Sequence, residues 1–295
     1  MKNEHGETLT VLVVTRNHQD HIAQAIESVR MQRGIVIDRL VVSDDCSTDR
    51  TVEVANEVIA RHGMTAEVIE SPRRLGIAPH YQKLFASVET ELVAVLEGDD
   101  YWFDILKLSR QLSLLHTYPY TSACALGYMH YHQTTKNFEG RSFGEGAISI
   151  LGTEDIVNGE DGFGFSNMVY RTDVLRRIPS EFYLLKSYDW ITNILVSREA
   201  PIIRLDIPGF VHRVTSAGAY AGLGLVGQLE TFIECVESYL PYSDEYTAGL
   251  LEARLVLAKA TLEHVRAPEP EPAPAPEPPP VTRRMKSAIK RLIGK

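Results

Sequence analysis

Cysteine is scarce in this chain of 295 residues. Cys46, Cys124 and Cys235 are its three cysteines, and no metal-type spacing links them. An odd number of widely separated cysteines argues against a disulfide framework and against a cysteine-based zinc site. We therefore expect free thiols in a reducing compartment.

Long apolar segments are missing as well. No run of eighteen apolar residues occurs, so the sequence predicts no membrane-spanning helix. The opening residues, MKNEHGETLT, are polar and lack the apolar core of a signal peptide. Together these absences predict a cytoplasmic location.

Positive charge is in deficit over most of the chain. The net charge is −9, which argues against nucleic acid as a partner of the main body. Residues 281–295 are the exception, because they carry six Lys or Arg and no acidic residue. The body is therefore more acidic than the total suggests, and the C-terminal tail is basic.

What the chain does have is an alternation of strand-like and helix-like patterns. Predicted strands cover residues 9–14, 36–43, 66–70 and 91–97, and predicted helices cover 21–33, 47–61, 78–88 and 105–116. Alternation of this kind predicts a doubly wound α/β sheet, which binds ligands beyond the carboxyl ends of its strands. The turn after the first strand, TRNHQDH, has no glycine. That absence argues against a dinucleotide-dependent oxidoreductase and against a nucleotidyltransferase.

The predicted strand ends bring acidic and basic side chains to one edge of the sheet. They carry Thr15, Arg16 and Asn17, then Asp44 and Asp45, then Arg73 and Arg74, and finally Glu97, Asp99 and Asp100. Carboxylates with open coordination positions suit Mg²⁺ or Mn²⁺, and a divalent metal neutralises a diphosphate leaving group. Any one of these acids alone would be read as a helix cap or a turn residue. Together they indicate a metal and a diphosphate.

Three segments carry a resemblance to a known family. Residues 10–34 (TVLVVTRNHQDHIAQAIESVRMQRG), 41–51 (VVSDDCSTDRT) and 96–115 (LEGDDYWFDILKLSRQLSLL) resemble family-two glycosyltransferases with the GT-A fold. In that family they correspond to the opening strand and turn, the nucleotide-binding signature and the metal-binding segment. The match is strong over about 8–115, weaker over about 150–222 and absent beyond about 240.

The resemblance implies a role for each strand end. Thr15 and the Asp44/Asp45 pair would contact the base and ribose of a nucleotide sugar, with Arg16 and Asn17 as further donor-binding candidates in the same turn. Glu97 and Asp99 match the two acidic positions of the metal motif, although glutamate replaces the commoner aspartate. Asp100 would support the donor or the acceptor pocket.

The adjacent arginines of the third strand end are assigned from their position alone. Arg73 and Arg74 could bind the pyrophosphate, because a guanidinium group binds phosphate oxygens in a bidentate manner. The alternative is a solvated surface pair.

The second half supplies the remaining candidates. SYDW at 187–190 resembles the family segment that begins a helix with Asp-Trp, so Asp189 is the candidate general base; the alternative is a helix N-cap.

FVHRVTSAG at 210–218 resembles a loop that closes over the site. The family histidine of that loop is Thr215 here, which leaves His212 as a candidate metal ligand or a structural residue, and Arg213 as a diphosphate partner. We interpret His130-x-His132 as an exposed strand face rather than a metal site.

The domain interpretation follows from these matches. Residues 1–222 are predicted to form a mixed-sheet GT-A domain, in which about 1–118 bind the nucleotide sugar and about 119–222 face the acceptor. Residues 223–266 predict a pair of helices, 267–281 a proline-rich linker, and 282–295 a basic amphipathic tail. Such a tail fits the anionic inner face of a membrane, whereas a soluble tail or a helix that binds a protein is the alternative.

The function implied by the resemblance is inverting transfer of a sugar. The donor would be a nucleotide-diphosphate sugar, the cofactor Mg²⁺ or Mn²⁺, and the acceptor a carbohydrate or a lipid-linked molecule in cell-surface polysaccharide or glycan synthesis. The alternative is a nucleotide-sugar binding module without catalysis, because Glu97 and the missing histidine depart from the family pattern.

Overall fold

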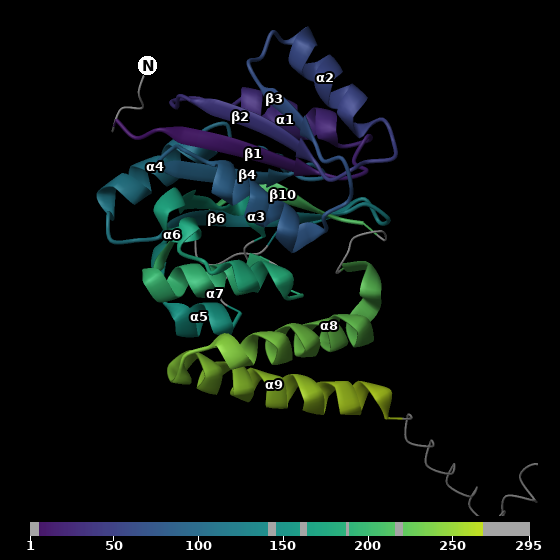
Figure 1. Cartoon of the computed structure of the whole chain (residues 1–295), viewed down its shortest axis with the longest axis vertical. Coiled ribbons are helices and arrows are strands. Elements are labelled where there is room, and N and C mark those ends of the chain that lie inside the picture. The colour runs from purple at the N-terminus through teal and green to yellow at the C-terminus, as the bar shows by residue number, and fades with distance from the viewer. Residues whose placement is uncertain (1–5, 141–145, 160–163, 187–188, 216–220, 268–295) are drawn as a thin grey trace, which may run out of the picture.

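The computed structural model describes residues 6–140, 146–159, 164–186, 189–215 and 221–267. Within these residues a ten-stranded mixed sheet is covered by helices on both faces (Figure 1). The first four strands are β1 (Leu9–Thr15), β2 (Arg39–Asp44), β3 (Glu67–Glu70) and β4 (Leu92–Glu97). They pair in parallel in the order β3-β2-β1-β4, as the alternation with helices predicts.

The helices between these strands are close to their predicted positions. They are α1 (Ile22–Arg30), α2 (Thr51–Arg61), α3 (Ile77–Ser87) and α4 (Lys107–Thr117). Helix α2 begins later than the capping pattern at 47–49 suggests. The Asp49 carboxylate accepts the Thr51 backbone N–H at 3.0 Å and the Thr51 hydroxyl at 2.5 Å. The capping residues therefore form a turn that is part of the site described below.

The second half extends the sheet with strands of both directions. They are β5 (Tyr101–Trp102), β6 (Ala123–His132), β7 (Asn137–Gly140), β8 (Ile148–Leu151), β9 (Val169–Arg171) and β10 (Ile202–Val214). Strand β9 is antiparallel to both β4 and β6, and β10 is parallel to β6. Strands β6 and β10 therefore run in the same direction as β1 to β4. Their carboxyl ends lie along the same edge of the sheet.

Short helices connect these strands. They are α5 (Thr153–Val157), α6 (Thr172–Arg176) and α7 (Asp189–Glu199), with 3₁₀ turns η1 (Phe165–Asn167), η2 (Ser180–Leu184), η3 (Ala221–Leu223) and η4 (Leu240–Tyr242). The predicted C-terminal pair is present as α8 (Gly224–Tyr239) and α9 (Glu245–Arg266). The segment from 120 to 222 is thus more regular than its sequence indicates, because its elements are stabilised by long-range pairing.

Two apolar cores lie on opposite faces of the sheet. Alternate residues of β1 divide between them, with Val11 and Val13 in the core beneath α1, α2 and α4, and Leu12 and Val14 in the other. The second core includes residues of α3, α5, α7, α8 and α9, and α5, α7, α8 and α9 stack on that side in Figure 1. Burial on both faces explains why β1 reads as a continuous apolar run. The predicted mixed α/β fold is confirmed.

Among the described residues, none of the helices is long and apolar enough to span a bilayer. The three cysteines are free thiols. Beyond Ala267 the predicted linker and the predicted basic tail lie outside the described residues, and the predicted domain limits stay predictions.

Candidate active site

Two acidic loops flank the end of strand β1. The Asp45 backbone N–H donates to the Thr15 carbonyl at 3.0 Å, and the Gly98 N–H donates to the Val14 carbonyl at 2.7 Å. Thr15 itself is buried, and its hydroxyl lies 3.2 Å from His18 Nδ1. The structure therefore brings the strand ends of β1, β2 and β4 together at one edge, as their parallel order requires.

Gly98 allows the closest of these approaches. A Cβ atom added at this position would lie 2.6 Å from the Thr15 hydroxyl oxygen and 3.0 Å from His18 Nδ1. Real Cβ atoms essentially never approach other atoms so closely, so a side chain at this position would push the two loops apart. The glycine between Glu97 and Asp99 is thus what lets these two acids lie against the first turn.

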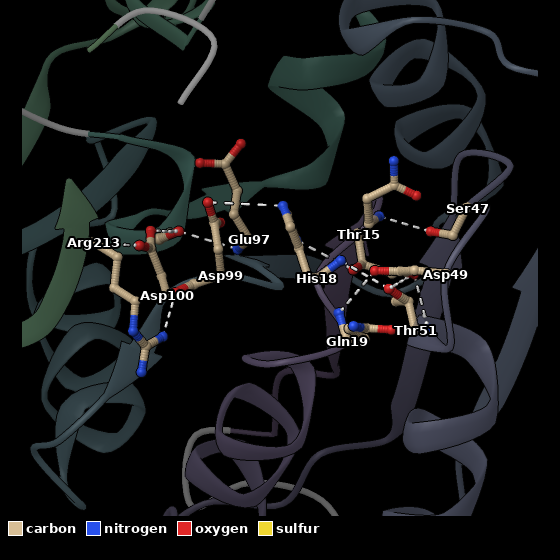
Figure 2. A network of polar contacts seen from close by, with 12 residues as sticks. Thr15, His18, Gln19, Ser47, Asp49, Thr51, Glu97, Asp99, Asp100 and Arg213 are labelled. Carbon is tan, nitrogen blue, oxygen red and sulfur yellow. Dashed lines mark hydrogen bonds and ion pairs between the residues drawn. The ribbon is translucent and has the colours of Figure 1, made fainter. Parts of the chain in front are cut away.

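The turn after β1 is fastened to the loop after β2 by polar side chains (Figure 2). Asn17 has a positive φ of 55°, and its side-chain oxygen accepts the Thr48 N–H at 2.9 Å. The Asn17 N–H donates to Ser47 Oγ at 2.8 Å, and the His18 N–H donates to Thr51 Oγ1 at 2.7 Å. His18, Ser47 and Thr51 were not among the predicted site residues. Their signal in the sequence is a run of short polar residues after each of two adjacent strands.

The paired aspartates of β2 shape these loops. Asp44 accepts hydrogen bonds from the backbone N–H of Ser47, at 2.7 Å, and from its hydroxyl. Asp45 accepts the Leu75 N–H at 2.7 Å and the Gly76 N–H at 2.9 Å. Both aspartates are buried. Their visible role is to position backbone, and their predicted contacts with base and ribose stay predictions.

The predicted arginines sit in different surroundings. Arg73 and Arg74 are exposed, on the loop that Asp45 holds in place. Arg16 is half-buried, and its Nε atom has no hydrogen-bond partner within the described residues. A buried donor without an acceptor costs free energy, about 1–3 kcal/mol, unless something else accepts its hydrogen.

The loop after β4 concentrates negative charge. Glu97 Oε1 accepts the Tyr81 hydroxyl at 3.2 Å, and Asp99 Oδ2 lies 3.7 Å from His18 Nε2. Burial, together with the charges of Asp99, Asp100 and Asp189, raises the pKa of Glu97 well above its ordinary value. Three carboxyl groups from two parts of the chain therefore act electrostatically on Glu97.

Asp100 connects this loop to the second half of the protein. Its Oδ2 atom accepts the Ser166 hydroxyl at 2.6 Å, and its Oδ1 atom accepts the Arg213 N–H at 2.9 Å. Burial, followed by the charge of Asp99, raises its pKa well above the ordinary value. Ser166 Oγ also accepts the Glu97 N–H at 3.0 Å. Asp100 is thus the junction of β4, η1 and β10.

The Arg213 guanidinium makes hydrogen bonds to other groups of the protein. It lies beside Asp99 and Asp100 (Figure 2) and donates to the Asp99 carbonyl. It also donates to the Gln24 side chain and lies 4.8 Å above the Tyr101 ring. These contacts fix the backbone of the acidic loop. The predicted diphosphate contact of Arg213 stays a prediction, whereas its positioning role is visible in the structure.

Buried hydrogen bonds connect the residues that follow the acidic loop to η1. Trp102 Nε1 donates to the Ser166 carbonyl at 2.7 Å, and Lys107 Nζ donates to Gln111 Oε1 at 2.7 Å and to the Asn167 carbonyl at 3.2 Å. Lys107 is fully buried, and burial lowers its pKa to about 7. The helical pattern of 105–116 predicts an amphipathic helix and does not reveal that a lysine on it is buried.

Asp189 is the first residue of α7. Its Oδ1 atom accepts the Trp190 N–H at 2.8 Å, and burial raises its pKa to about 6. Its charge in turn raises the pKa of Glu97 and of Tyr81. Asp189 is therefore within electrostatic reach of the acidic loop, although it is 92 residues away in sequence. Both the predicted role as a base and the alternative role in capping α7 fit this position.

His212 lies in a group of histidines rather than in the acidic loop. Its Nδ1 atom is 3.0 Å from His130 Nδ1, and burial lowers its pKa while the charge of Asp99 opposes that shift. The prediction that His212 binds metal is not tested by these contacts. The strand face of His130 and His132 is half-buried rather than fully exposed, and His130 packs against His212.

The acidic loop fits a hard divalent cation that keeps part of its shell for other ligands. Within the described ranges, no group of three or more His, Cys, Asp or Glu side chains is arranged to hold a metal ion. Mg²⁺ is commonly bound by one or two carboxylates together with water and substrate phosphates. Glu97 and Asp99 meet that smaller requirement. Burial and then the charges of Asp99, Asp100 and Asp189 raise the pKa of Glu97, and a bound cation would oppose these effects.

The arrangement of the sheet defines the class of protein. A mixed sheet with acidic loops at the ends of β2 and β4 is the GT-A glycosyltransferase fold. The structure is similar to that of TarS residues 1–349 from S. aureus in complex with UDP-GlcNAc, with a TM-score of 0.63 and 17% identity over 88% of this chain and 74% of that one. It is also similar to the mannosyltransferase PcManGT from Pyrobaculum calidifontis in complex with GDP-Man and Mn²⁺, with a TM-score of 0.56 and 15% identity over 100% of this chain and 89% of that one.

The family follows from the sequence match. The model of glycosyl transferase family 2 matches residues 10–179, which is more than half of the chain. The chain belongs to that family. Among curated proteins it is similar to the uncharacterized proteins Rv1520 of Mycobacterium tuberculosis and Mb1547 of Mycobacterium bovis, with 29% identity over 116 residues in each case. Each match covers 39% of this chain. It spans about a third (34%) of the length of the relative.

Proposed function

We propose that this protein transfers a sugar from a nucleotide-diphosphate sugar to an acceptor hydroxyl, with Mg²⁺ or Mn²⁺ as cofactor. The observation that carries the proposal is the gathering of Glu97, Asp99 and the electrostatically coupled Asp189 beside the first turn of a family 2 fold. The complexes of TarS with UDP-GlcNAc and of PcManGT with GDP-Man and Mn²⁺ support a donor and a metal of this kind.

The donor would lie across the ends of β1, β2 and β4. Arg16 offers a buried Nε–H group without a partner among the described residues, and a diphosphate oxygen is a suitable acceptor for it. Arg73 and Arg74 are exposed on the loop that Asp45 fixes, so their guanidinium groups are available to a phosphate. Base and ribose would contact Thr15, Asn17 and the loop that begins at Asp44 and Asp45.

Glu97 and Asp99 would hold the cation, with His212 as a third candidate. When bound, the cation supplies Lewis-acid stabilisation of the diphosphate that leaves. The residues of the chain then have two further tasks. Asp100 and Arg213 keep the backbone of the acidic loop in place, and the Tyr81 hydroxyl orients the Glu97 carboxylate.

Asp189 would act as the general base. A pKa of about 6 leaves it mostly ionised at neutral pH, yet more basic than an ordinary aspartate. It would take the proton of the acceptor hydroxyl, and that oxygen would attack the anomeric carbon from the side opposite the diphosphate. Such an attack inverts the configuration at that carbon. The effect of the Asp189 charge on the pKa of Glu97 supports a position of the base near the metal site.

The acceptor is proposed to be a carbohydrate or a lipid-linked molecule of cell-surface polysaccharide or glycan synthesis, reached from the cytoplasmic side. The basic residues of 282–295 would add peripheral contact with an anionic membrane face. Co-sedimentation of the full chain and of a version that ends at Arg266 with anionic liposomes tests that contact. Equal pelleting of the two would contradict it.

The donor proposal is tested with a panel of UDP- and GDP-linked sugars. Thermal unfolding is measured with each donor in the presence of Mn²⁺ and in the presence of chelator, and hydrolysis of the bound donor is followed in parallel. We expect one donor to raise the Tm when the metal is present and to be hydrolysed slowly. Binding without any turnover would favour the inactive module, and no binding by any donor would contradict the proposal.

A further inference from the structure

Strands β6, β7 and β10 present a surface that the donor site does not use. His130 pairs in register with Glu139 of β7 and with His212 of β10, and His132 pairs with Asn137 and Val214. Because side chains alternate along a strand, His130, His132, His212 and Glu139 lie on the same face of this three-stranded ribbon. We refer to these four residues as the histidine face.

The members of the histidine face contact one another. The rings of His130 and His212 are 5.1 Å apart between centroids, and those of His130 and His132 are 6.2 Å apart. His132 Nε2 lies 3.2 Å from Glu139 Oε2. The side chains of His132 and Glu139 are 37% and 72% exposed, so this end of the face is open to a ligand, and His212 is half-buried.

A cavity of about 320 Å³ lies against the open end. It is lined by His130, His132, Glu139, Gly140 and Val214. Small-molecule sites in proteins begin at roughly 300 Å³. The lining combines imidazoles, which can donate and accept hydrogen bonds, with a carboxylate that accepts and an apolar side chain.

The cavity shares strand β10 with residues that contact the acidic loop. Strands β6 and β10 end at the same edge as β1 and β4, and Arg213, one residue before the cavity-lining Val214, donates its backbone N–H to Asp100 and its guanidinium to the Asp99 carbonyl. The charge of Asp99 also acts on His212. His212, on the cavity's face of β10, is therefore within electrostatic reach of the acidic loop, whereas the Arg213 side chain belongs to the opposite face. A molecule in the cavity would lie along β10 from the backbone contact that holds Asp100.

We infer that the cavity at the histidine face binds a neutral sugar unit of the acceptor. The inference rests on the proposed function, and it names the class of acceptor. Vicinal hydroxyls both donate and accept, which matches imidazole and carboxylate partners at hydrogen-bonding distance from each other. Glu139 and the nearby acidic loop disfavour an anionic ligand. Nor do the described residues at this face form a group arranged to hold a metal ion.

The test measures sugar binding separately from donor binding. Saturation-transfer NMR with the methyl glycosides of glucose, galactose, mannose and N-acetylglucosamine detects sugar binding by the full-length protein. The variants are His132→Ala and Glu139→Gln. The controls are His264→Ala and Glu263→Gln, which change the same residue types at exposed positions of α9. Binding of the nucleotide sugar with Mn²⁺ and the Tm are measured for every variant.

We expect at least one glycoside to bind the wild type, and each cavity variant to weaken that binding by about tenfold because hydrogen bonds are lost. Donor binding and Tm would stay near the wild-type values, as would glycoside binding by the two α9 variants. The inference is overturned if no glycoside binds to a protein that binds its donor, or if binding survives both cavity substitutions. If the wild-type protein binds no nucleotide sugar, the proposed function is contradicted instead.

Discussion

The two halves of the sheet reach the same edge in different ways. In the first half, β1 to β4 are joined by helices and pair in parallel, and β2 lies between its sequence neighbours β1 and β3. In the second half, β9 is inserted antiparallel between β4 and β6, and the short β5 pairs with β10, more than a hundred residues away. The proposed donor chemistry therefore depends on local geometry, and the proposed base and acceptor surface depend on long-range pairing. At the acidic loop, Asp100, Ser166 and Arg213 join the two halves.

The largest expected effect comes from the second half. Asp189→Asn removes the proposed base and should reduce transfer by about 10²–10⁴-fold, the usual contribution of acid–base catalysis, while donor binding persists. Steady-state kinetics and donor titration measure the two quantities. Asp173→Asn changes another aspartate in the first turn of a helix, at an exposed position, and should leave transfer unchanged. If Asp189→Asn transfers normally, the base lies elsewhere.

The pH dependence sharpens the same assignment. Asp189 accepts a proton only when it is ionised, and burial raises its pKa to about 6. The kcat/KM for transfer should therefore be constant above pH 7 and fall as the pH drops through about 6. An ordinary aspartate would place this fall near pH 4. A profile that is flat down to pH 5 would contradict the assignment.

A glycine tests how tightly the first half is packed. Gly98→Ala places a methyl group 2.6 Å from the Thr15 hydroxyl oxygen, so the acidic loop must shift. We expect a loss of about 1–3 kcal/mol in the free energy of unfolding, as for other overpacked sites, together with weaker donor binding. Gly249→Ala in α9 meets no atom within 4 Å and should be neutral or slightly stabilising. Equal stability of the two variants in urea unfolding would show that the loop is not tightly packed.

The buried lysine links stability to pH. Burial lowers the pKa of Lys107 from 10.5 to about 7, so between these values the unfolded chain binds the proton and the folded chain does not. The free energy of unfolding should therefore rise from pH 7 toward pH 10, by up to about 1.4 kcal/mol per unit. Lys107→Met should abolish this rise. The two proteins are compared by urea unfolding at several pH values, and parallel profiles would contradict the assignment.

The smallest expected effect concerns the loop that carries Arg73 and Arg74. The Asp45 carboxylate accepts the N–H groups of Leu75 and Gly76 with separate oxygens. Asp45→Asn leaves one oxygen, so one N–H loses its acceptor at a cost of about 1–3 kcal/mol. We expect a several-fold higher Kd for the donor and little change in kcat. A larger effect on kcat than on Kd would assign Asp45 to the reaction itself.

The sequence predicts the first half well because its signals are local. Apolar runs, helical periods and the acids at 44–45 and 97–100 lie within single elements, and a parallel order places their ends together. The contacts between loops are less accessible. Nothing in the sequence around Lys107 shows that its side chain is buried under Asn167, and nothing near His130 shows that it meets His212. These contacts depend on the pairing of β6 with β10 and the insertion of β9, which join residues that are far apart in the chain.

The proposed chemistry depends on the Glu97 and Asp99 carboxylates sharing one divalent cation with a nucleoside diphosphate. The most direct test is the electron paramagnetic resonance of Mn²⁺ titrated with the full-length protein, with and without UDP or GDP. We predict that one of these nucleotides tightens Mn²⁺ binding by at least tenfold, and that Asp99→Asn removes this effect. Mn²⁺ binding that is independent of both nucleotides, or that is unchanged in Asp99→Asn, would contradict the account.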